Sequence, residues 1–178
     1  MDTLIGKYHL HPIIDHFTIA LLAAGILADL LAYLVSSRLG HRSFNAGALA
    51  DRLSATAPTL LIPGAISAIL SRITGESEAE RVWDTISPAA HHVLFSETGI
   101  SSFFSHAVLG SYLMYIFGSL AAWRVLVEIS PKLKRFQPAY FAVAMVALCA
   151  LLYQGKTGGE LVFNYRAGTS HEQTASQH

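Results

Sequence analysis

The stretch His11-Pro12-Ile13-Ile14-Asp15-His16-Phe17 is followed at once by an apolar run from Thr18 to Val35. It places two histidines and an aspartate at the start of a segment that can cross a lipid bilayer, which takes about 20 mainly apolar residues. The proline suits the first turn of a helix, where a missing backbone N–H costs nothing. The stretch therefore predicts a membrane-spanning helix with ionisable groups at its beginning.

Composition agrees with this interpretation. The chain has 178 residues, of which 52% are hydrophobic and only 13% are charged. A soluble domain carries about 25% charged residues, so the low value indicates a membrane protein. Cys149 is the single cysteine, which excludes an intrachain disulfide and the Cys-x-x-Cys-His motif of covalently attached haem. We expect one domain over residues 1–168, followed by a polar tail over 169–178.

Three further apolar segments follow the first one. The pattern predicts an all-α fold, an integral membrane four-helix bundle with helices over about 13–35, 53–70, 106–123 and 138–153. A long loop over 71–105 is expected to join the second and third helices. The glycines between Gly155 and Gly159 are expected to end the fourth helix, leaving Leu161 to Tyr165 as a strand-like or interfacial segment. No internal repeat is evident.

The connections differ in charge, and this difference predicts an orientation. The loops over 36–52 and 124–137 carry an excess of arginine and lysine, whereas the other side of the predicted bundle is richer in acidic residues. The positive-inside rule places the basic loops in the cytoplasm. Both termini then face outward, toward the periplasm, in a multi-pass protein of the bacterial inner membrane.

Nine histidines are present, and all except His41 fall on the predicted outer side. His16 lies about one turn into the first helix and His106 opens the third, so both imidazoles are expected at similar depth. We interpret them as axial ligands of a b-type haem, a common arrangement between helices of a bundle. Gly110, one turn after His106, leaves room for a flat macrocycle. Lys156 or Arg166 is expected to pair with the propionates.

Two other interpretations of these histidines remain open. His16, His106 and His11 are candidate ligands of a bare transition metal such as copper, zinc or iron, with further histidines or Asp15 completing the site. Alternatively, the histidines only hydrogen-bond backbone or water at the membrane interface, and the protein holds no cofactor. Deeper in the first helix, Asp29 is expected to form an ion pair with Arg124 or Arg52, or else to act as a proton-relay or quinone-site carboxylate.

Several motifs together resemble one family. They are His11-Pro12-x-x-x-His16-Phe17, Thr74-Gly75 at the end of the second helix, His106, and Gly158-Gly159-x-Leu161-Val162-Phe163 after the fourth. With them the chain, from His11 to about Gly168, resembles the bacterial membrane-protein family catalogued as "domain of unknown function 2231". The resemblance implies a four-helix bacterial membrane protein and implies no activity. It also draws attention to the three histidines and the glycine pair.

The leading functional hypothesis is a membrane-embedded b-type haem electron-transfer subunit of a bacterial redox or respiratory complex. Its expected partners are the lipid bilayer, other membrane subunits, and a periplasmic electron carrier or quinone, with no nucleic acid. We expect an electron-transfer or non-catalytic subunit rather than an independent enzyme. The alternatives are a cofactor-free accessory or anchoring subunit of a larger complex, and a membrane metal-binding protein.

Overall fold

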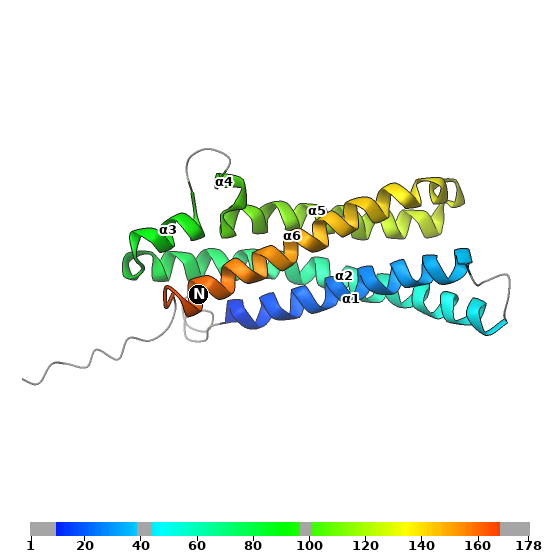
Figure 1. Cartoon of the computed structure of the whole chain (residues 1–178), viewed down its shortest axis with the longest axis horizontal. Coiled ribbons are helices and arrows are strands. Elements are labelled where there is room, and N and C mark those ends of the chain that lie inside the picture. The colour runs from blue at the N-terminus through cyan, green and yellow to red at the C-terminus, as the bar shows by residue number, and fades with distance from the viewer. Residues whose placement is uncertain (1–9, 39–43, 97–100, 168–178) are drawn as a thin grey trace, which may run out of the picture.

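The bundle consists of four long helices. The structure, a computed structural model, describes residues 10–38, 44–96 and 101–167. The long helices are α1 (Leu10–Arg38), α2 (Phe44–Val82), α5 (His106–Ile129) and α6 (Gln137–Phe163). In Figure 1 they lie along one common direction, and α1 begins at the same end of the molecule at which α6 ends. The described residues form helices and turns and no strand, so the predicted all-α bundle is confirmed.

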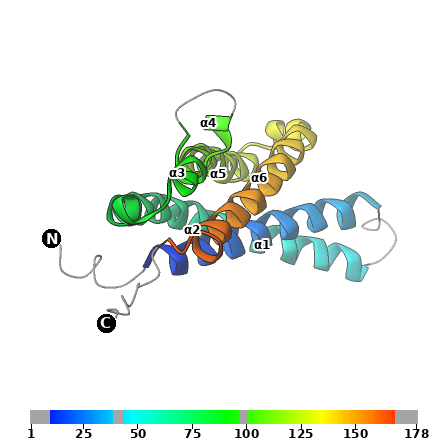
Figure 2. The same cartoon turned by 60° about the vertical axis from the view of Figure 1, so that its left-hand side comes forward.

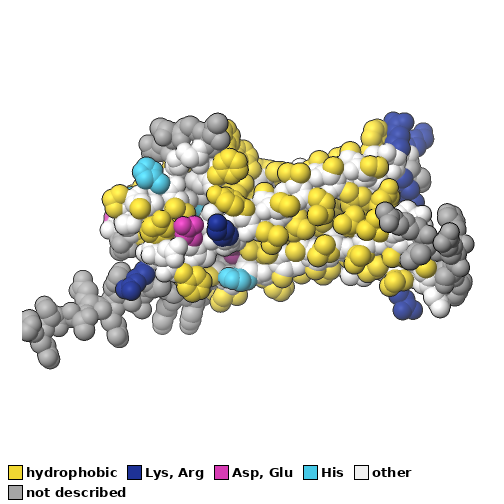
Figure 3. Space-filling view, in the orientation of Figure 1, with side chains coloured by type: hydrophobic (Ala, Val, Ile, Leu, Met, Phe, Trp, Pro, Cys, Tyr) yellow, Lys and Arg dark blue, Asp and Glu magenta, His cyan; other side chains and the backbone are white. Residues whose placement is uncertain are grey.

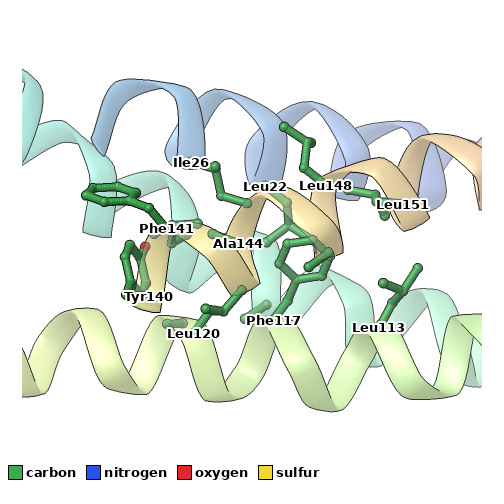
Figure 4. Close-up of a cluster of buried hydrophobic side chains, with 14 residues drawn as sticks. Leu22, Ile26, Leu113, Phe117, Leu120, Tyr140, Phe141, Ala144, Leu148 and Leu151 are labelled. Carbon is green, nitrogen blue, oxygen red and sulfur yellow. The ribbon is translucent and has the colours of Figure 1, made fainter. Parts of the chain in front are cut away.

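The middle of the bundle is filled by apolar side chains from all four long helices. Leu22 and Ile26 of α1 meet Phe117 of α5 there, as Figure 4 shows, together with side chains of α6. Helices α1 and α2 interlock through two glycines. A Cβ on Gly25 would come within 2.8 Å of the Leu61 side chain, and a Cβ on Gly64 within 2.8 Å of the Leu22 side chain. Each leucine therefore occupies the space that a glycine of the opposite helix leaves open.

The outside of the bundle is also apolar. Many large hydrophobic side chains are exposed, among them Phe17, Ile66, Tyr115 and Val146. In Figure 3 hydrophobic side chains cover the middle of the visible face, and a group of lysines and arginines lies at the right-hand end. All four long helices are long and apolar enough to cross a membrane. An exposed apolar belt around a helical bundle is the surface that a lipid bilayer would cover.

The helices are longer than the apolar segments that predicted them, and the predicted outer loop is partly wrong. Helix α2 continues to Val82, so residues 71–82 are helical instead of forming the first part of a loop over 71–105. This part of the chain contains three glutamates and two arginines, which are good helix formers. A hydropathy pattern detects only the apolar part of such a helix. The remainder of the predicted loop contains η1 (Trp83–Thr85), α3 (Pro88–Leu94) and α4 (Ser101–Phe104).

The expected end of the fourth helix is also wrong. Helix α6 runs through Gly155, Gly158 and Gly159 to Phe163, so the segment over 161–163 is helical and the following two residues form a turn, in place of a strand-like segment. Glycine weakens a helix by about 1 kcal/mol relative to alanine, but packing overrides this preference. Leu161 is buried in a second, smaller core with side chains of α2 and α3 and with Ile86, which follows η1. In Figure 2, α3 lies beside the end of α2, on the outside of the bundle.

Candidate functional site

A cavity of about 820 Å³ lies among the four long helices, at the end where α1 and α5 begin. This is the left-hand end in Figure 1. Leu113, Phe117 and Leu151, labelled in Figure 4, line its apolar inner part. Its polar lining comes from the helix ends: His11, Asp15, His16, Arg72, His106 and Gln154. The volume falls in the range of about 300–1,000 Å³ that is usual for small-ligand and cofactor sites.

Two histidines meet at this cavity. His11 lies in the first turn of α1, and His106 is the first residue of α5. Their ring centroids are 6.3 Å apart, and the ring planes are nearly perpendicular, at 80°. His106 is buried, with 8% of its surface exposed, and His11 is half-buried. From the sequence, His16 is predicted to be the second ligand beside His106, whereas the structure brings His106 together with His11.

Each of these imidazoles is held by a threonine of a neighbouring helix. Nδ1 of His106 lies 3.2 Å from Oγ1 of Thr157 on α6. Nδ1 of His11 lies 3.4 Å from Oγ1 of Thr74 on α2, a longer and weaker contact. Neither threonine is predicted as a site residue from the sequence. The signal available in the sequence is that both are followed by glycine near the end of a long apolar helix.

The two following glycines make space for the imidazoles. A Cβ on Gly75 would lie 2.9 Å from Cε1 of His11, and a Cβ on Gly158 would lie 3.0 Å from Cε1 of His106. Distances this short require the neighbour to move, so alanine fits neither position without a shift of the ring. The two glycines thus leave room for the histidine rings, and the helices continue through them instead of ending there.

The His and Thr-Gly positions occur twice, once in each helical hairpin. In the hairpin of α1 and α2, a histidine begins the first helix and Thr74-Gly75 lies near the end of the second. In the hairpin of α5 and α6, His106 and Thr157-Gly158 occupy the corresponding places. The two hairpins therefore form an internal repeat, although no repeat is evident from the sequence alone. The cavity lies where the two repeated halves meet.

Toward the opposite end of the bundle, the two hairpins again show the same sequence spacing. Asp29 is eighteen positions after His11, and Arg124 is eighteen positions after His106. The two side chains form a buried ion pair, with Nε of Arg124 2.9 Å from Oδ1 of Asp29. Arg124 also donates to Glu128 and to the backbone and side chain of Ser54. The ion pair expected for Asp29 is confirmed, with Arg124 as its partner.

The other predicted haem residues lie differently. His16 is exposed on α1 and lines the cavity, and its Nδ1 donates to the carbonyl of Pro12 at 2.6 Å. A Cβ on Gly110 would collide with the side-chain amide of Gln154, so this glycine makes room for a glutamine of α6. Lys156 and Arg166 are exposed, and neither lines the cavity. The arginine that does line it is Arg72.

Arg72 lies at the edge of the cavity and makes two hydrogen bonds there. Its Nε donates to Oγ of Ser111 on α5 at 2.8 Å, and its Nη2 donates to Glu76 at 2.6 Å. On the other side, Oγ of Ser71 donates to Oδ1 of Asp15 at 3.0 Å. The cavity lining thus carries a cation and three carboxylates, those of Asp15, Glu76 and Glu78, in addition to the imidazoles.

The bare-metal interpretation has less geometric support. Across the three described ranges of the chain, no group of three or more His, Cys, Asp or Glu residues is arranged to hold a metal ion. His91 is used elsewhere, stacked on the Trp83 ring and placed 2.8 Å from the Trp83 carbonyl oxygen. His9, His41, His171 and His178 lie outside the described residues.

The fold and the cavity define a class of protein: a four-helix bundle of membrane-spanning length with a histidine pair between its two hairpins. A family model described as "Predicted membrane protein (DUF2231)" matches residues 7–171, and the chain belongs to this family. The resemblance noted in the sequence is thereby confirmed. No curated protein and no solved structure matched the chain.

Proposed function

We propose that this protein is a membrane-embedded b-type haem electron-transfer subunit, with His11 and His106 as the residues that would hold the iron. The observation that carries the proposal is the 6.3 Å separation of the two ring centroids across an apolar cavity. Two imidazoles that bind one metal from opposite sides, each through a nitrogen about 2 Å away, have centroids roughly 6 Å apart. His11 and His106 are therefore spaced as two imidazoles that would hold one iron ion between them.

The number of ligands favours haem over a bare metal. A transition-metal ion held only by protein needs three or four side chains, as structural and catalytic zinc sites do. The described residues offer no such group, but they offer two imidazoles from different helices. Two imidazoles suffice for haem iron, since the macrocycle supplies the remaining nitrogens. When bound, haem would supply a one-electron couple whose potential depends on the axial ligands and on burial.

The residues of the chain have separate roles in this proposal. Gly75 and Gly158 keep space for the imidazoles, and Leu113, Phe117 and Leu151 keep water from the inner part of the cavity. An anionic group of the cofactor would meet Arg72, which replaces Lys156 and Arg166 as the expected partner because it lines the cavity. Charge-assisted hydrogen bonds from arginine to a carboxylate are among the strong polar contacts in proteins.

The membrane orientation supports a site on the outer face. Lys132, Lys134 and Arg135 are exposed in η2 (Pro131–Phe136), at the end opposite to the cavity. By the positive-inside rule this basic end faces the cytoplasm of a bacterial inner membrane, so the cavity faces the periplasm. A haem there would exchange electrons with a periplasmic carrier, a quinone or another membrane subunit of a redox complex.

The test is a reduced-minus-oxidised absorption spectrum of the protein purified in mild detergent from cells supplied with haem. We expect a sharp α band and a shifted Soret band. His106→Ala and His11→Ala should each abolish the low-spin spectrum. His91→Ala, a histidine outside the cavity, is the matched control and should leave the spectrum unchanged.

The outcomes separate the competing functions. Loss of the spectrum in His16→Ala but not in His11→Ala would show that His16, and not His11, is the second ligand. A colourless wild-type protein that carries stoichiometric metal would favour the metal-binding alternative. A colourless protein without metal would leave the accessory or anchoring subunit as the remaining candidate, and would overturn the haem proposal.

A further inference from the structure

Each of the two threonine hydroxyls next to the histidines has only one proton, and each lies within hydrogen-bond distance of a backbone carbonyl of its own helix. Oγ1 of Thr157 donates to the carbonyl of Gln154 in its own helix at 2.9 Å. Oγ1 of Thr74 likewise faces the carbonyl of Leu70 at 2.9 Å and that of Ser71 at 3.2 Å. A carbonyl oxygen can only accept a hydrogen bond, and these carbonyls lie closer to Oγ1 than Nδ1 of the histidine does, at 3.2 Å for Thr157 and 3.4 Å for Thr74. We therefore assign each hydroxyl proton to the backbone carbonyl.

This assignment of the hydroxyl protons gives the hydrogen-bonding role of each imidazole. With its proton used, the threonine oxygen can offer Nδ1 only a lone pair, so Nδ1 of His106 and Nδ1 of His11 carry the hydrogen and donate it. In a neutral imidazole the other nitrogen, Nε2, then has the free lone pair. Nε2 is the atom that would bind a metal.

We infer that Thr74 and Thr157 are positioning residues, one for each histidine, which hold the imidazoles in the metal-binding tautomer. This inference rests on the proposed function. Groups that accept a hydrogen bond from a ligating histidine set its tautomer and ring orientation and raise its basicity. The same unit of histidine, threonine and glycine occurs in both hairpins, although the helices around the two units differ in sequence.

The two threonines are expected to differ in effect. The contact to His106 is shorter, at 3.2 Å against 3.4 Å, and His106 is the more buried of the two histidines. A hydrogen bond is stronger in a water-excluded site and costs more when it is lost. Thr157 should therefore have the larger influence on the iron.

The experiment uses the full chain in detergent, with Thr157→Val, Thr74→Val and the conservative variants Thr157→Ser and Thr74→Ser. Valine keeps the shape and removes the acceptor, so haem affinity should fall by about tenfold or more, within the range for outer-shell partners. The midpoint potential should become more positive, because an imidazole that donates no hydrogen bond is a weaker ligand for ferric iron. Serine should restore both quantities.

Thr56→Val is the matched control, because Oγ1 of Thr56 makes the same kind of bond to the carbonyl of Arg52 but faces no histidine. It should change neither potential nor haem affinity. If the wild type holds haem and Thr157→Val keeps its potential and affinity, the positioning role is refuted while the haem proposal stands. If the wild type holds no haem under full supply, the proposed function itself has failed.

Discussion

Arg124 carries a positive charge into the interior of the bundle, where only 6% of the residue is exposed. Its guanidinium is satisfied by groups from three helices: Asp29 of α1, Ser54 of α2 and Glu128 of α5. A buried ion pair is costly to break from one side, because the remaining charge is left without compensation. Arg124 therefore ties the two hairpins together at the end opposite to the cavity.

Asp29→Leu should destabilise the protein by about 3–5 kcal/mol, since it leaves a buried guanidinium without its main partner. The double variant Asp29→Leu with Arg124→Leu should lose much less, because both charges are removed together. Thermal unfolding in detergent measures both. Equal losses in the single and double variants would contradict the ion-pair account.

At the scale of elements, the helices of this protein are set by contacts between glycines and large side chains. The end of α6 stays helical across three glycines, and side chains of other helices pack closely against two of them, Ile19 against Gly155 and His106 against Gly158. Gly158 faces the His106 ring, whereas Gly118 on α5 has no atom within 4 Å of a would-be Cβ. These two positions have the same residue type in a helix interior but opposite surroundings.

Gly158→Ala should therefore destabilise the protein by about 1–3 kcal/mol, because overpacking against the imidazole outweighs the gain in helix propensity. Gly118→Ala is the matched control, and should stabilise it by about 0.5–1 kcal/mol. Chemical or thermal unfolding followed by circular dichroism compares the two. A stabilising Gly158→Ala would show that the His106 ring can move aside and that Gly158 is not needed to make room for it.

At the scale of the whole molecule, the bundle is longer than a membrane is thick. Helix α2 has 39 residues and is therefore about 58 Å long, against a hydrocarbon core of about 30 Å. The last turns of α2 carry Glu76, Glu78, Glu80 and Arg81, so this end projects into water. We therefore expect the polar part of the cavity to lie near the membrane surface.

The predicted orientation can be tested with single cysteines in a Cys149→Ala background. Lys156→Cys on the cavity end of α6 should react with a membrane-impermeant maleimide in intact spheroplasts. Lys134→Cys in η2 should react only after the membrane is permeabilised. Both lysines are exposed, so the reagent can reach either position once it is on the correct side. The reverse pattern would place the cavity in the cytoplasm.

Much of the fold was predictable from the chain because spanning a membrane is a local property of each helix. The number, apolar content and order of the four helices follow from runs of residues, and so does the expectation that Asp29 forms an ion pair. The choice of Arg124 over Arg52 as its partner came from the tertiary structure. The helix ends were not predictable, since the glycines of α6 are weak helix formers and the side chains packed against Gly155 and Gly158 come from distant parts of the sequence. The pairing of His106 with His11 rather than His16 depends on how two hairpins pack, and one turn of helix along α1 changes which imidazole faces the cavity.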